Sequence, residues 1–200
     1  MKTLDGQRGF SLIDLLVVVA LIGVAGAIAV PMTGTAVAGQ RLKGHAQALN
    51  NLVGLAKMRA SSGFTRARVR ANLTDNTYVL ERWDKIAAAW VPESAAENMF
   101  RGVRFGFGNL ASPPANTQDQ IALSPPCQVG VEPASATIGN TACIVFNSRG
   151  LPIDGNGVLS GGNALYLTDG SMVYATTVTA TPRIRLWSTR ANAANWTEQQ

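Results

Sequence analysis

A single carboxylate, Asp14, lies in an otherwise uncharged stretch of this 200-residue chain, residues 10–32. An ionised carboxylate costs about 2.5–3.5 kcal/mol at the centre of a bilayer, and less near its edge. Such a group needs a cationic partner or a position at the membrane interface. The residues leave both interpretations open, because either one removes the cost of burying the charge.

Two groups of basic residues could bind phosphate. The first lies where a helix is expected to meet a strand, and the second lies near the C-terminus, where no acid occurs between Asp169 and Glu198. Within a strand, Arg183 and Arg185 would project from one face and could engage successive phosphates of a nucleic-acid backbone. The alternative is a solvated strand face. The residues concerned are Lys57, Arg59, Arg66, Arg68 and Arg70 in the first group, and Arg183, Arg185 and Arg190 in the second.

The chain has two cysteines, Cys127 and Cys143. In an exported domain, an even count favours a disulfide. The bridge would close a loop of about 17 residues and contribute about 3 kcal/mol to stability. The alternative is a pair of free, buried thiols.

No set of residues indicates catalysis. His45 is the only histidine and is far from both cysteines in the sequence, so neither a metal site nor a Ser-His-Asp arrangement is expected. The chain has no phosphate-binding glycine loop and no dinucleotide fingerprint. We therefore expect a protein without a metal or other cofactor that is not an enzyme.

The apolar stretch has the length of a membrane helix. Its 23 residues, 10–32, would rise about 1.5 Å each and span a bilayer core. No small-residue cleavage site follows it, which argues against an ordinary secretory signal peptide. We predict that residues 1–9 form a leader, cut between Gly9 and Phe10, so that the helix stays on the mature protein. The alternative is an uncleaved signal anchor.

This N-terminal segment resembles the class III leader of type IV prepilins and type II secretion pseudopilins. The resemblance rests on Arg8-Gly9, Phe10, the run Ser11-Leu12-Ile13-Asp14, Gly23 and Pro31. It implies cleavage after Gly9 by a prepilin peptidase and N-methylation of Phe10. It also implies that Asp14 pairs with the α-amino group of a neighbouring subunit, and that Pro31 kinks the helix. Asp14 stands where the family nearly always has glutamate, so the charge is kept on a shorter side chain.

The C-terminal part resembles the GspH/FimT group of minor pilins. The carrying stretches are residues 164–174 and 178–185. FimT-like members include DNA-binding subunits with a Gly-Arg-x-Arg motif, and here Pro182 precedes Arg183-Ile184-Arg185 in place of that glycine. The resemblance implies a minor pilin of a type IV pilus that binds double-stranded DNA for natural transformation through Arg183, Arg185 and Arg190. The alternative is a GspH-type pseudopilin of a type II secretion system without DNA binding.

The same resemblance implies where the protein works. We expect a non-enzymatic structural subunit that passes once through the inner membrane and carries a periplasmic head. Its partners would be the prepilin peptidase, other pilins or pseudopilins, the inner membrane and, for a FimT-like member, double-stranded DNA. Assembly would place it in a pilus or pseudopilus at the cell surface.

Composition and periodicity favour an α+β fold. Charged residues make up 14% of the chain and glycines number 20, which is typical of a β-rich, turn-rich head. The formal charge of +5 falls to +4 once the leader removes two basic residues and one acid, which permits but does not require an anionic partner. Residues 33–62 read as an amphipathic helix that continues into the head, and residues 63–200 as the head itself, with its sheet packed on the helix.

Alternating patterns predict the strands of the head. Residues 108–142 are expected to be irregular and pinned by the cysteines. Phe100, Phe105 and Phe107 are expected in the core. The predicted strands are Thr65–Leu73, Thr77–Trp83, Ile86–Val91, Phe100–Phe107, Cys143–Asn147, Ala164–Thr168, Ser171–Thr179 and, as the last, Arg183–Trp187.

Overall fold

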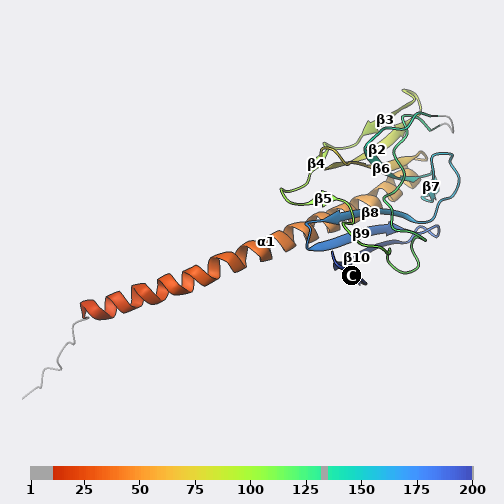
Figure 1. Cartoon of the computed structure of the whole chain (residues 1–200). Coiled ribbons are helices and arrows are strands. Elements are labelled where there is room, and N and C mark those ends of the chain that lie inside the picture. The colour runs from red at the N-terminus through yellow and green to blue at the C-terminus, as the bar shows by residue number, and fades with distance from the viewer. Residues whose placement is uncertain (1–10, 132–134, 200) are drawn as a thin grey trace, which may run out of the picture. The chain divides into compact units, whose positions relative to one another are not determined.

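The computed structural model describes residues 11–131 and 135–199, with backbone alone for residues 28–36 and 194. Within these residues, one helix, α1 (Leu12–Ser62), precedes eleven strands (Figure 1). The chain forms two compact units, residues 1–38 and residues 39–200. Helix α1 runs through both units, so its C-terminal half belongs to the head. The predicted leader, residues 1–9, and Phe10 lie outside the described residues.

The C-terminal half of α1 is the centre of the head. Its buried side chains recur every three or four residues and form one continuous stripe, the central stripe. The helix ends at Ser62, as predicted, because Phe64 adopts a positive φ of 46° and the Thr65 N–H donates back to the Ala60 carbonyl at 3.2 Å, a Schellman-type end. The stripe residues are all fully buried: Leu42, Ala46, Leu49, Val53, Ala56 and Ala60.

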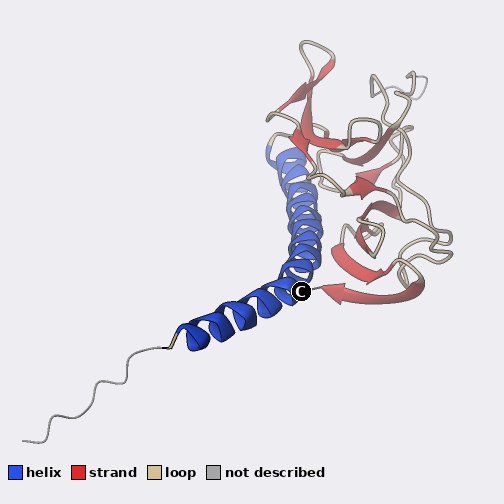
Figure 2. Ribbon diagram, turned by 60° about the vertical axis from the view of Figure 1, so that its left-hand side comes forward, coloured by secondary structure: helices blue, strands red, loops and turns tan. Residues whose placement is uncertain are grey.

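One antiparallel sheet, sheet A, packs on this stripe (Figure 2). Its strand order is β3-β2-β1-β6-β7, with β4 also paired to β2. Ala67, Val69 and Ala71 of β1 join the core, whereas Arg68 and Arg70 alternate onto the other face, as predicted. The strands are β1 (Ala67–Asn72), β2 (Thr77–Asp84), β3 (Ala89–Pro92), β4 (Glu97–Asn98), β6 (Thr141–Phe146) and β7 (Pro152–Ile153).

A second antiparallel sheet, sheet B, packs on the same core. Its strand order is β11-β10-β9-β8-β5. Leu165 and Leu186 face the helix side, while Tyr166 and Trp187 face the opposite side in a second buried cluster. Leu110 and Phe107 pack against that second cluster. The strands are β5 (Arg104–Phe105), β8 (Asn163–Thr168), β9 (Met172–Val178), β10 (Ile184–Arg190) and β11 (Ala193–Gln199).

The irregular segment before β6 is fastened by the predicted disulfide, which is confirmed. Cys127 and Cys143 are bonded, with their Cα atoms 5.0 Å apart. Two backbone hydrogen bonds flank the bridge: Ile138 N–H donates to the Cys127 carbonyl at 2.7 Å, and Cys143 N–H to the Pro125 carbonyl at 2.9 Å. The disulfide therefore ties the segment directly to strand β6.

Three predictions for the head were wrong: the length of one strand, the burial of Phe100 and the identity of the last strand. The expected strand Phe100–Phe107 is reduced to β5, because Gly102 and Gly106 adopt positive φ angles of 94° and 139° that interrupt an extended chain. Phe100 is 58% exposed instead of being in the core. The expected last strand, Arg183–Trp187, begins at Ile184, continues to Arg190 and is followed by β11, which was not predicted.

Within the part of the chain that the structure describes, no helix has a segment both long and apolar enough to cross a membrane. The predicted membrane segment, residues 10–32, includes Phe10 and the side chains of residues 28–32, which lie outside the described residues. The backbone of α1 is helical through Pro31, so the helix continues beyond this residue, as the sequence predicted.

Replacing both cysteines by serine should destabilise the head without changing its fold. The bridge closes a sequence separation of 16 residues, and a loop of that size contributes about 3 kcal/mol. We expect urea unfolding of residues 39–200 to show a loss of about 2–4 kcal/mol with an unchanged far-ultraviolet circular dichroism spectrum. A loss below about 0.5 kcal/mol would mean that the segment is held by its other contacts.

Candidate functional site

Asp14 caps its own helix. Ser11 precedes the first helical residue, and its hydroxyl oxygen accepts the Ile13 N–H at 3.3 Å. In return, the Asp14 carboxylate accepts the Ser11 N–H at 3.3 Å. This is a capping box of the Ser-x-x-acid type, which satisfies two helix N–H groups that otherwise lack partners. The pattern Ser11-x-x-Asp14 is visible in the sequence, and the prediction missed it.

Two other predicted site residues of this segment precede Asp14. Gly9 and Phe10, the predicted cleavage and methylation sites, lie outside the described residues. The capping box gives the Asp14 carboxylate a partner within its own chain. A carboxylate that accepts one N–H keeps free lone pairs, so a further cation could still bind it.

Residues 12–24 of α1 present exposed apolar side chains. Within residues 12–24 the large aliphatic side chains are between 48% and 78% exposed. A surface of this size is unusual for a helix in water and needs an apolar environment or a partner. The exposed side chains are Leu12, Ile13, Leu15, Leu16, Val17, Val18, Val19, Leu21, Ile22 and Val24.

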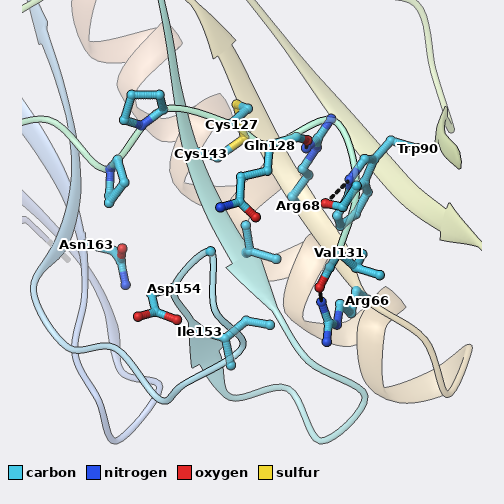
Figure 3. A pocket seen from close by; sticks show the side chains of 15 residues that line it. Arg66, Arg68, Trp90, Cys127, Gln128, Val131, Cys143, Ile153, Asp154 and Asn163 are labelled. Atoms are coloured by element: carbon cyan, nitrogen blue, oxygen red, sulfur yellow. Dashed lines mark hydrogen bonds between the residues drawn. A yellow bond between two sulfur atoms is a disulfide. The ribbon is translucent and has the colours of Figure 1, made fainter. Parts of the chain in front are cut away.

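The first arginine group is not a free basic patch. Arg68 is 3% exposed, and its guanidinium contacts the Glu81 carboxylate at 2.6 Å. Its Nη1 donates to the Gln128 carbonyl at 2.6 Å, and its Cζ lies 4.1 Å from the Trp90 ring centroid (Figure 3). Burial lowers the pKa of Arg68, and Glu81 opposes that shift. Arg68 therefore serves as a structural cation that joins β1, β2, β3 and the irregular segment.

The remaining members of this group are engaged as well. Arg70 Nε lies 2.9 Å from the other Glu81 oxygen, but its N–H is not directed at a partner, so the contact is electrostatic. Arg66 donates to the Val131 carbonyl at 2.7 Å (Figure 3). Arg59 lies 3.1 Å from Glu93. Glu81 and Glu93 offset part of the charge that the sequence suggested for phosphate, whereas the carbonyl contact of Arg66 occupies donors without neutralising it.

The C-terminal arginines lie at the two ends of β10. Arg183 is exposed and lies directly before β10, where the Thr179 N–H still donates to its carbonyl at 3.1 Å. Arg185 Nη1 lies 3.2 Å from the Glu198 carboxylate. Arg190 is exposed at the far end of β10, about 16 Å from Arg185 at 3.3 Å per residue. A phosphate clamp made of Arg183 and Arg185 therefore competes with an acid already in place.

Glu198 is the residue that sequence reasoning missed. It lies on β11, and its neighbour across the ladder is Trp187 of β10. This pairing places its carboxylate diagonally opposite Arg185. The signal available in the sequence was weak: Arg190-Ala-Asn192-Ala is a plausible hairpin turn, followed by the alternating Asn195, Trp196 and Thr197.

A small cavity lies beside the buried arginine (Figure 3). Its volume is about 30 Å³, enough for about two water molecules and too small for a cofactor. Asp154 and Asn163 line it. The Asp154 carboxylate accepts the N–H groups of Asn156 and Val158 at 2.9 Å each, so it stabilises a turn. Among the described residues, no cluster of His, Cys, Asp and Glu could hold a metal ion.

Comparisons with known proteins give one structural likeness. No family model and no curated protein matches the chain. A solved structure that resembles it is that of the minor pseudopilin EpsH from the type 2 secretion system of Vibrio cholerae, with a TM-score of 0.45 and 10% sequence identity. The match covers 76% of this chain and 99% of that chain. A likeness at this level assigns no function, which must come from the residues themselves.

Replacing Glu81 by Gln should strongly destabilise the head. The substitution leaves the buried Arg68 guanidinium without a counter-ion, and uncompensated buried charges of this kind cost about 3–5 kcal/mol. Chemical denaturation of residues 39–200 would measure the loss.

Glu93→Gln is the matched control. Glu93 pairs with Arg59 and Arg82, whose side chains are 54% and 41% exposed, and exposed ion pairs contribute about 0–1 kcal/mol. Equal effects of the two substitutions would contradict the structural role assigned to Arg68.

Proposed function

We propose that this protein is a non-enzymatic minor subunit of a type IV pilus or of the related type II secretion pseudopilus. The observation that carries the proposal is the contrast between the exposed apolar part of α1 and the part that is buried in the head. Its residues 12–24 expose large aliphatic side chains, whereas its residues 42–60 form the centre of the head. One continuous helix thus joins a folded head to an apolar segment that requires a membrane or neighbouring apolar helices.

The leader-like motif agrees with this role. Arg8-Gly9-Phe10 precedes the helix that starts at Leu12, and the acid at position 14 follows. In the proposed maturation of the protein, a prepilin peptidase cuts after Gly9, Phe10 is N-methylated, and the head remains in the periplasm. During assembly, the Asp14 carboxylate, which caps the helix in this structure, would form an ion pair with the α-amino group of a neighbouring subunit.

The charge arrangement favours a structural subunit over a DNA-capturing one. Arg185 faces Glu198 at 3.2 Å, and three members of the first arginine group pair with Glu81 or Glu93, namely Arg59, Arg68 and Arg70. Capture of double-stranded DNA by Arg183 and Arg185 is the second candidate, supported by the exposure of Arg183 and the mild basic charge. The two candidates predict different effects on DNA binding when Arg183 and Arg185 are replaced.

Replacing Asp14 by Ala should abolish incorporation into filaments while the head still folds. The shorter side chain can neither pair with a neighbouring amine nor cap α1. Filaments sheared from cells that express each variant would be blotted for this subunit.

Asp14→Glu is the control, since it keeps the carboxylate, and we expect it to retain incorporation. Normal amounts of the Ala variant in filaments would exclude an assembly role for Asp14. Absence of the wild-type protein from filaments and from the membrane would refute the proposed function as a whole.

DNA binding by residues 39–200 should be weak and should change little in the Arg183→Gln/Arg185→Gln double variant. Because Glu198 already neutralises Arg185, only about one phosphate contact is lost. Each such contact contributes about −0.9 to the slope of log K against log salt. Titrations with double-stranded DNA at several salt concentrations would measure both quantities. Salt-sensitive binding that collapses in the double variant would instead establish DNA capture as the role of the head.

A further inference from the structure

His45, the only histidine of the chain, lies in a groove at the start of the head part of α1. The groove has a volume of about 430 Å³. One of its sides is a face of α1, and the other comes from β2, β4 and the loop that follows β4. Its lining residues are Gln40, Arg41, Gly44, His45, Ala48, Tyr78, Glu97 and Phe100.

The imidazole of His45 holds the loop after β4 against α1. Phe100 N–H donates a hydrogen bond to His45 Nε2 at 3.0 Å. The Phe100 ring packs edge-on against the same imidazole, with ring centroids 4.9 Å apart, and the Tyr78 ring lies 6.4 Å away on another side. The main chain and the ring of Phe100 thus both contact one imidazole, in a contact that joins residues 55 positions apart.

This contact requires an unprotonated Nε2. A neutral imidazole accepts a hydrogen bond at one ring nitrogen, whereas an imidazolium donates at both. Burial lowers the pKa of His45, and the nearby Glu97 carboxylate opposes that shift more weakly. The accepting form is therefore the one that the folded protein favours near neutral pH.

The charged and titratable groups around the imidazole come from three elements. Arg41 of α1 lies one helical turn before His45, with its Cζ 5.6 Å from the Phe100 ring centroid. Tyr78 of β2 donates its hydroxyl to the Glu97 carboxylate of β4 at 2.7 Å. Glu97 is thus already hydrogen-bonded, while Arg41 would repel a second cation in the groove.

We propose that His45 and Phe100 form a pH-sensitive latch. Neutral His45 accepts the Phe100 N–H and fastens residues 100–102, the Phe100 turn, to α1. A proton added at Nε2 removes the hydrogen-bond acceptor and turns the new His45 N–H toward the Phe100 N–H. It also places a positive charge near Arg41. The Phe100 turn then leaves the helix, because the hydrogen bond that ties it to α1 has been lost.

The release is confined to the turn. Strand β4 stays paired with β2 through Tyr78 and Glu97, and Met99 N–H still donates to the Asn76 carbonyl at 3.1 Å. Val103, directly after the turn, is buried in the core, and its N–H donates to the Phe100 carbonyl at 3.0 Å, which limits the movement to residues 100–102. Phe100, already 58% exposed, would move away from Gly44 and Ala48 and widen the small-residue face of α1. Acid thereby changes a surface of the head without unfolding it.

The sign of the pH effect follows from the lowered pKa. The folded state binds the proton less readily than the unfolded state, so the contribution of His45 to stability is present above about pH 6.5. It is lost as the pH falls below that value toward the pKa of the folded protein. The inference does not rest on the proposed role in a filament, since it concerns the head alone.

Nuclear magnetic resonance of the full chain in detergent micelles tests the latch. We expect the Phe100 amide resonance to titrate together with the His45 ring, at a midpoint below 6.5. The protection of that amide against hydrogen exchange should fall about tenfold on protonation, the effect of losing one hydrogen bond.

His45→Gln is the matched control, because its side-chain oxygen accepts a hydrogen bond at every pH, and its Phe100 amide should not titrate. His45→Ala removes the acceptor and should leave the Phe100 amide unprotected throughout. A Phe100 amide that stays unchanged while His45 titrates would overturn the proposal, and so would a His45 midpoint at or above 6.5.

Discussion

Both sheets of the head depend on the central stripe of α1. Leu49 and Val53 are fully buried, and the same core includes Val69 of sheet A and Leu165 of sheet B. The inner face of each sheet packs on the helix as well as on residues of the other sheet, because the helix lies in the core that the two sheets share. The stripe mixes alanines with leucines and a valine, and its small residues let strands approach the helix closely. Loss of this stripe would remove the support of every other element.

The irregular segment is held to this scaffold by charge as well as by the disulfide. Cys127 joins it to β6, while the neighbouring Gln128 carbonyl accepts a hydrogen bond from Arg68 of β1. A buried guanidinium is costly unless its donors are satisfied, and Glu81, Gln128 and the Trp90 ring satisfy it together. The arginines of β1 thus have a structural explanation that does not require a nucleic acid.

The two halves of α1 obey different physical requirements. Residues 12–24 expose aliphatic side chains that water solvates poorly, whereas the half after Gly39 is amphipathic and is covered by the head. A helix with this division suits a subunit that is anchored by one half and presents a folded domain with the other. The groove around His45 lies at the start of the covered half, where the head first meets the helix.

The sequence by itself determined the elements whose signals are local. A periodic apolar pattern predicted the helix to Ser62, alternation placed Val69 and Arg68 on opposite faces of β1, and the two cysteines predicted their bridge. The tertiary structure alone decided which charges meet and which apolar residues stay exposed. Arg185 faces Glu198 only because β11 folds back on β10, and Phe100 lies outside β5 because the positive φ of Gly102 interrupts the extended chain between them. Such contacts join residues distant in sequence, and neither periodicity nor composition encodes the distance between them.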